Sequence, residues 1–180
     1  MAASEKSSYR VALGGIVAGL CVMIMFLTGV FPALYIAAPM IAGVLMIILV
    51  EEVSVGWAWL TYIAVSLLAL IVTFDKEAAL MFILFFGYYP ILRLYIERIR
   101  IMPVRWLCKL ALLNLFLVLD FWLTVYVLGL PTFEEDGKAM LAGLAAVFNL
   151  VFLFYDRLLG QMNWFYRTLF VKKILGKHRK

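Results

Sequence analysis

The stretch FFGYYPILRLYIERIRIMPVRW, residues 85–106, begins as an apolar run typical of a membrane helix and ends among arginines. Pro90 removes one backbone donor and favours a bend, and Pro103 favours a break before the next helix. Cytoplasmic loops of membrane proteins collect Lys and Arg. We therefore expect a cytoplasmic elbow here, between two membrane-spanning helices, with the cations Arg93, Arg98, Arg100, Arg105 and Lys109.

The composition extends this reading to the whole chain. Of its 180 residues 67% are hydrophobic, and the mean hydropathy is +1.05, outside the range of soluble domains. A helix needs about 20 mostly apolar residues to span the hydrocarbon core. The sequence predicts an all-α polytopic membrane bundle, residues 1–156, with six transmembrane helices over 11–31, 34–52, 56–74, 78–96, 106–130 and 138–156. The first run is longer than a signal-peptide core and five more follow, so we expect it to be retained.

The distribution of charge predicts the orientation. With the N-terminus inside, 14 of the 16 Lys and Arg residues fall on the cytoplasmic side, and only Lys76 and Lys138 lie outside. The predicted outer loops are acidic, with Asp75, Glu77, Glu134, Glu135 and Asp136. By the positive-inside rule both termini are cytoplasmic. We expect a multi-pass protein of a bacterial plasma membrane.

The C-terminal segment, residues 157–180, is too charged to span. Leu158, Met162, Phe165 and Leu169 recur at helical spacing among cations. This pattern is typical of an amphipathic helix that lies on the inner leaflet. Docking of a partner is the alternative role for this basic tail.

The sequence contains no recognisable catalytic constellation. It has no Ser/His/Asp set, HExxH motif or Walker A loop. The one histidine, His178, lies in the basic tail, and Cys21 and Cys108 belong to predicted spans. We expect no enzyme activity, no cofactor, no metal site and no nucleic-acid partner. An ATP-driven role would need separate ATPase subunits.

Asp120 is a carboxylate placed deep in a predicted span. It lies about 22 Å above Arg105 and about 16 Å below Pro131 along a helix. Such a group costs at least about 2.5 kcal/mol to insert, so it should face the bundle or a water-filled cavity. Thr124, four residues on, shares its face. Ligand or proton binding and a buried hydrogen bond to a neighbouring helix are both open.

Two further side chains are ligand candidates. Asn149 is a second polar group in a predicted span, for which an interhelical hydrogen bond is the plainer role. Tyr35 lies in the uncharged outer connection over residues 29–39. Its ring can stack on a ligand or belong to the aromatic belt of the membrane interface.

Two surfaces are candidates for partner docking. Ala12, Gly15 and Gly19 form a stripe of small residues on the first helix, and such spacing lets two helix backbones approach closely. The stripe serves either internal packing or the docking of another membrane subunit. At the elbow, Arg93 and Arg100 either anchor the loop to lipid headgroups or dock a partner.

Six short spans, both ends inside, the small stripe and the missing ATPase motif resemble the S components of energy-coupling factor (ECF) vitamin transporters. The opening RVALGGIVAGLCVMIMFLTGVFPALYIAAPMIAGVLMIILV is similar to their first two helices. The resemblance implies a substrate-binding subunit for a vitamin or related micronutrient, energised by a transmembrane coupling subunit and cytoplasmic ATPases. It places the docking stripe at Gly14 and Ala18, or at Gly15 and Gly19 beside Ala12, with glycine where the family has alanine.

Two rival classes remain. An MreD-like membrane scaffold is similarly small and poor in motifs, and should have a filled interior. An S component should instead hold a small molecule in the outer half, near the first loop and the fourth to sixth helices. A proton-coupled carrier would rest on Asp120 alone.

Overall fold

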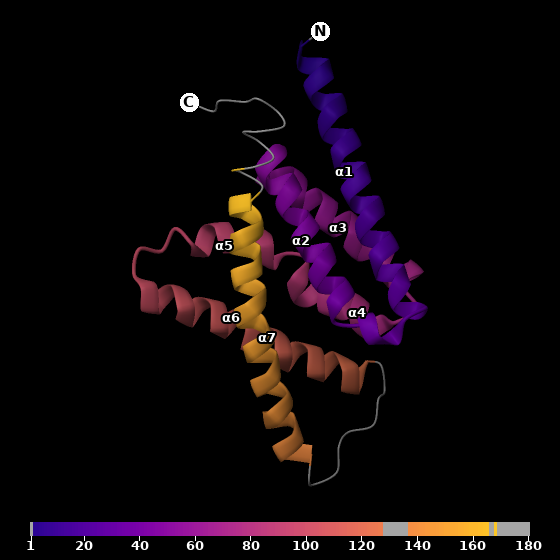
Figure 1. Ribbon diagram of the computed structural model, residues 1–180. Coiled ribbons are helices and arrows are strands. Elements are labelled where there is room, and N and C mark those ends of the chain that lie inside the picture. The colour runs from indigo at the N-terminus through magenta and orange to yellow at the C-terminus, as the bar shows by residue number, and fades with distance from the viewer. Residues whose placement is uncertain (1, 128–136, 166–167, 169–180) are drawn as a thin grey trace.

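The computed structural model describes residues 2–127, 137–165 and 168. Every regular element in these ranges is helical, and Figure 1 shows their arrangement. The helices are α1 (Ala2–Phe26), η1 (Leu27–Gly29), η2 (Pro32–Leu34), α2 (Ala37–Glu52), α3 (Val55–Val72), α4 (Lys76–Met81), η3 (Phe82–Phe86), α5 (Tyr89–Ile96), α6 (Met102–Tyr126) and α7 (Gly137–Phe165). The predicted all-α class is confirmed for this part of the chain.

The first three helices pack together, and polar residues cap the start of α3, the end of α3 and the start of α4. The Ser54 hydroxyl accepts a hydrogen bond from the backbone N–H of Trp57, at 3.4 Å, and begins α3. The Asp75 carboxylate does the same for α4 through the N–H of Ala78, at 3.1 Å. Such caps satisfy N–H groups that a first turn leaves free. The Lys76 ammonium donates to the carbonyl oxygens of Leu70 and Thr73, which closes the end of α3.

The predicted fourth span is interrupted by a π-helical segment. α4 continues directly into η3, whose residues Phe82–Phe86 have π geometry, and α5 follows at Tyr89. Pro90 lies in the first turn of α5, where its missing N–H costs no intrahelical hydrogen bond. The interruption therefore precedes the proline. Pro103 likewise lies in the first turn of α6.

Helix α2 is the centre of the molecule. It contacts α1, α3, α4, η3, α5 and α7. One hydrophobic cluster joins it to α1, α3 and α4, and a second joins it to η3, α5, α6 and α7. Gly43 permits the closest approach, because a Cβ there would meet the carbonyl oxygen of Phe86 and the hydroxyl of Tyr155.

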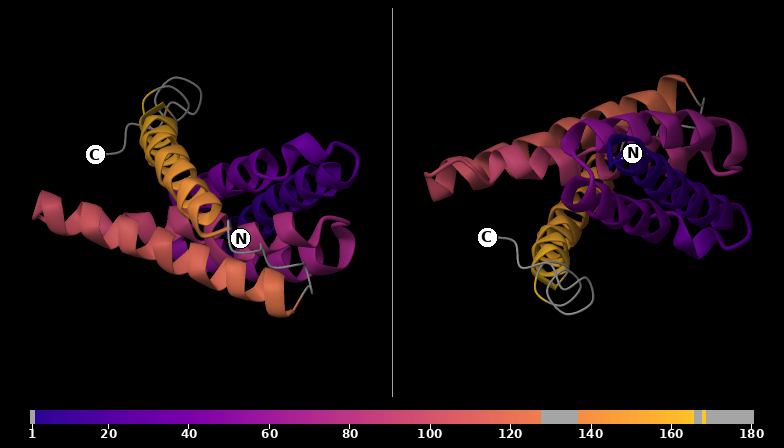
Figure 2. Two further views of the ribbon diagram at one scale, coloured as in Figure 1. Left: turned by 90° about the horizontal axis from the view of Figure 1, so that it is seen from below. Right: turned by 90° about the horizontal axis from the view of Figure 1, so that it is seen from above.

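The last two long helices cross one another. α6 runs across α7, and the two leave the α1–α3 group in different directions (Figures 1 and 2). The N-terminal end of α1, the α2–α3 turn and the C-terminal end of α7 lie toward one end of the molecule (Figure 1). At that end the Tyr9 hydroxyl donates to the Glu52 carboxylate at 3.4 Å, which ties α1 to α2.

Among the residues that the structure describes, five helical segments are long and apolar enough to cross a membrane, as expected for a multi-pass membrane protein: Ser7–Gly29, Val55–Val72, Lys76–Ile96, Met102–Tyr126 and Ala142–Phe165. The second predicted span differs, because α2 has 16 residues. At 1.5 Å per residue it is about 24 Å long, shorter than the hydrocarbon core of about 30 Å.

The boundary predicted between the bundle and a separate tail falls inside a helix. α7 continues without a break through residue 156 to Phe165. Leu158, Met162 and Phe165 are exposed on it. Leu169 and the rest of the predicted interfacial segment lie outside the described residues.

Candidate functional site

A partly buried network of charged side chains and one tyrosine lies where α5, α6 and α7 meet. We call it the charge network; its members are Tyr89, Arg93, Glu97, Arg105, Lys109 and Asp156. Helical spacing assembles it, because Tyr89, Arg93 and Glu97 are four residues apart on and just after α5, and Arg105 and Lys109 are four apart on α6. α7 contributes Asp156 alone.

Asp156 is the acceptor that joins the three helices. Its Oδ1 accepts from the Tyr89 hydroxyl at 2.7 Å and from Arg93 Nε at 2.9 Å. Its Oδ2 accepts from Lys109 Nζ at 2.7 Å. The side chains of Asp156 and Lys109 are only 6% and 3% exposed. A charge buried this deeply is stable only when paired and hydrogen-bonded, and Asp156 meets that condition.

Glu97 is the second acid of the network, at its solvent-facing edge. Its Oε1 lies 2.7 Å from Lys109 Nζ and 3.3 Å from Arg93 Nη2. Its Oε2 lies 3.2 Å from Arg105 Nη1. Three cations thus share two carboxylates. Because the oxygens are already engaged, the network is suited to hold helices together and offers no open set of metal ligands. In the described ranges, no group of three His, Cys, Asp or Glu residues could bind a metal ion.

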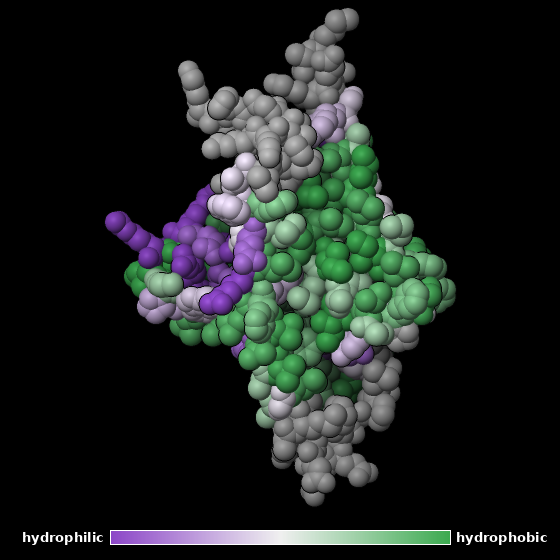
Figure 3. Space-filling view, viewed as in Figure 1, coloured by the Kyte–Doolittle hydropathy of each residue, from purple (hydrophilic) through white to green (hydrophobic). Residues whose placement is uncertain are grey.

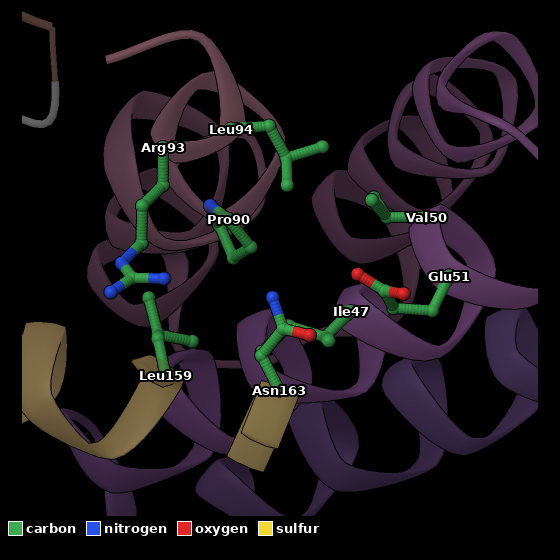
Figure 4. A pocket seen from close by; sticks show the side chains of 8 residues that line it. All are labelled: Ile47, Val50, Glu51, Pro90, Arg93, Leu94, Leu159 and Asn163. Carbon is green, nitrogen blue, oxygen red and sulfur yellow. The ribbon is translucent and has the colours of Figure 1, made fainter. Parts of the chain in front are cut away.

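A small pocket adjoins the network between α2, α5 and α7. Figure 4 shows Arg93 at one side and Glu51 at the other, with Asn163 between them. The remaining lining residues are Ile47, Val50, Pro90, Leu94 and Leu159. The cavity measures about 10 Å³, room for about one water molecule. Sites for small organic ligands are typically about 300–1,000 Å³. This pocket therefore fits a water molecule and no vitamin.

The predicted ligand residues fall into two groups. Asp120 and Thr124 lie one turn apart on α6, and Asp120 Oδ1 and Thr124 Oγ1 are buried without a hydrogen-bond partner among the described residues. Asn149 instead pairs with Asn114, amide to amide, at 3.4 and 3.5 Å across α6 and α7. Asn114 lies six residues before Asp120 on α6, and its side chain contacts α7. Tyr35 packs against both hydrophobic clusters.

The predicted docking residues also divide. Ala12, Gly15 and Gly19 are exposed on α1, and a Cβ added at Gly15 or Gly19 would meet no described atom within 4 Å. The neighbouring pair packs inward, since a Cβ at Gly14 would lie 3.5 Å from Thr61 Oγ1 and Ala18 packs against the first cluster. At the elbow, Arg100 is exposed, whereas Arg93 belongs to the charge network and is not presented to a partner.

The sequence did not identify the charge network. Lys109 counts as a topology anchor by the positive-inside rule, and Asp156 falls at the end of the last predicted span. One feature of the sequence pointed to the network: Lys109 and Asp156 both lie next to apolar runs, so a single helix can include the charge together with the apolar run. Comparison with known protein families, curated proteins and solved structures finds no match for this chain.

Proposed function

We propose that this protein is a membrane subunit that acts through a second membrane protein, which docks on the small-residue face of α1. The observation that carries the proposal is the open surface at Gly15 and Gly19, next to exposed Ala12. Small residues allow a partner helix to approach closely, and such packing drives helix association in lipid. Gly14 and Ala18 face the interior, so they serve the packing of α1 within the protein and leave Gly15 and Gly19 for a partner.

The topology that we propose has six spans and two cytoplasmic ends. α2 counts as the sixth span although it is short, because protein surrounds much of it and it needs little matching to lipid. One observation supports this assignment: toward one end of the molecule lie the start of α1, the α2–α3 turn and the end of α7 (Figure 1). By the positive-inside rule, the 14-to-2 division of cations in the sequence favours cytoplasmic ends.

Docking is tested by inserting a photo-crosslinking residue at Gly15 or Gly19 in cells. We expect a discrete protein adduct from each position. The control is the same residue at Ile71 on α3, which is exposed and carries no small stripe. Gly15→Leu and Gly19→Leu should abolish the adduct formed from Ala12 while expression stays near the wild-type level. Equal adducts from Ile71, or none from α1, would refute the docking face.

Two kinds of subunit fit this proposal, and different observations favour them. The substrate-binding subunit of a micronutrient uptake transporter, of the S-component type, is favoured by the unpaired oxygens of Asp120 and Thr124. Buried polar atoms without a partner are costly, and a ligand would satisfy them. An MreD-like scaffold is favoured by the packed interior, in which two hydrophobic clusters join α2 to the helices around it.

Native mass spectrometry of the detergent-purified protein distinguishes the two. An uptake subunit should carry a small molecule that is lost in Asp120→Asn, while the melting temperature changes little. Leu153→Asn, at an exposed position of α7, is the matched control and should keep the molecule. A scaffold should carry none in either protein. If Asp120→Asn keeps the molecule, Asp120 is not a ligand-binding charge.

A further inference from the structure

We infer that the elbow between α5 and α6 is a binding site for the phosphate headgroup of an anionic phospholipid, held by Arg98 and Arg100. The site goes beyond the proposed function, since it would operate with or without a docked subunit. It rests on three observations: the charge left over by the network, the exposure of these two arginines, and the apolar surface next to them.

The network leaves the elbow with excess positive charge. Residues 93–109 carry five cations and one acid, and Asp156 adds a second acid, so the cations of this set outnumber its acids by three. Arg93, Arg105 and Lys109 share the two carboxylates. Within the described ranges, Arg100 has no carboxylate at ion-pair distance, and the guanidinium of Arg98 lies over the ring of Tyr95 at 5.4 Å. Both side chains are exposed.

The surroundings favour a lipid over a soluble anion. The elbow forms a hydrophilic patch that borders hydrophobic surface (Figure 3). Next to the arginines, Ile101, Met102 and Leu107 are each at least 60% exposed. A phospholipid matches both surfaces at once, because its phosphate accepts from guanidinium groups while its acyl chain covers the apolar side chains. An acidic protein segment would leave those apolar side chains uncovered.

The start of α6 adds to the attraction for a phosphate. Its N-cap residue, Ile101, makes no side-chain cap, and its first turn contains no acidic residue. The partial positive charge of the helix N-terminus is therefore not compensated by the protein itself. The arginines carry the inference, and this helix end adds a favourable field at the same location.

The test is a titration of the full-length protein in detergent with phosphatidylglycerol and, separately, phosphatidylcholine, followed by native mass spectrometry. We expect phosphatidylglycerol to bind more tightly than phosphatidylcholine. Arg98→Gln/Arg100→Gln should weaken phosphatidylglycerol binding by roughly tenfold or more, since each cation near anionic lipid contributes about a factor of five. The matched control is Arg10→Gln/Arg157→Gln, which removes two exposed cations elsewhere.

A second variant separates a lipid from a free phosphate. Leu107→Gln should weaken phosphatidylglycerol binding, because it removes contact with the acyl chain, and should leave competition by inorganic phosphate unchanged. Equal losses in the two arginine double variants would mean diffuse attraction without a site and would overturn the inference. Unchanged phosphatidylglycerol affinity in Arg98→Gln/Arg100→Gln would also overturn it and would leave the elbow to a protein partner.

Discussion

At the scale of single residues, Asp156 is the side chain on which most of the charge network depends. It accepts from Tyr89, Arg93 and Lys109, which belong to two other helices. Asp156→Asn removes the charge and leaves buried Lys109 with Glu97 alone. Breaking a buried ion pair by removing one partner costs about 3–5 kcal/mol. We expect a clear fall in melting temperature in detergent, measured by intrinsic fluorescence.

The control for Asp156 is its exposed neighbour, Arg157, where Arg157→Gln should change stability little. A double-mutant cycle with Lys109→Met provides the sharper measurement. Since the two groups contact one another, the double variant should lose less stability than the sum of the single losses. Additive losses would mean that the pair contributes no coupling energy.

Residue-scale contacts of this kind could not be predicted from the sequence. Asp156 pairs with residues 47 and 63 positions away, and nothing local distinguishes a charge that ends a span from one that is buried by a distant partner. The positive-inside rule predicted Lys109 to be a topology anchor, yet its side chain is buried. Asn149 shows the same limit, since the sequence predicted an interhelical hydrogen bond as its plainer role but did not identify Asn114 as the partner.

At the scale of elements, the long helices were predictable because each depends on a continuous apolar run. The π-helical segment was not, since Phe82–Phe86 has no turn residue or polar group that would mark it. π segments often occur at functional positions in helices. Here the segment directly precedes α5, whose Tyr89 and Arg93 donate to Asp156.

The packing of α2 against its neighbours depends on Gly43. Gly43→Ala would press a methyl group against the carbonyl of Phe86 and the hydroxyl of Tyr155. We expect a loss of about 1–3 kcal/mol in stability, because overpacking moves backbones apart. Gly143→Ala on α7, where a Cβ meets no described atom within 4 Å, is the control and should be close to neutral. Equal melting temperatures for the two variants would contradict this role of Gly43.

At the scale of the whole molecule, the proposed topology gives a direct expectation for labelling. The protein must first lack Cys21 and Cys108, its two free cysteines. A cysteine at Lys76 should then react with an impermeant maleimide in intact cells, and a cysteine at Arg100 should react only after the cells are opened. Labelling of Arg100→Cys in intact cells would reverse the orientation. The positive-inside rule is the physical reason for the expected asymmetry.

The span count shows what hydropathy alone cannot decide at this scale. Residues 34–52 are as apolar as a span, yet the helix that they form has 16 residues and lies in the centre of the molecule. The helix is shorter than the hydrocarbon core, and other helices pack around it. Hydropathy cannot reveal this packing, because it depends on which other helices surround the apolar run.

The charge network also imposes a delay during biosynthesis, because its members are far apart in the sequence. Arg93 and Lys109 are synthesised 63 and 47 residues before Asp156. At about 5–20 residues per second, the ribosome needs roughly 3 to 13 seconds to close the longer interval. During that time Glu97 is the one acid of the charge network that has been synthesised. Lys109 therefore cannot yet be buried against Asp156 as it is in the finished protein. A chain that stalls before residue 156 would therefore carry Arg93 and Lys109 without the Asp156 carboxylate that pairs with both of them in the finished protein.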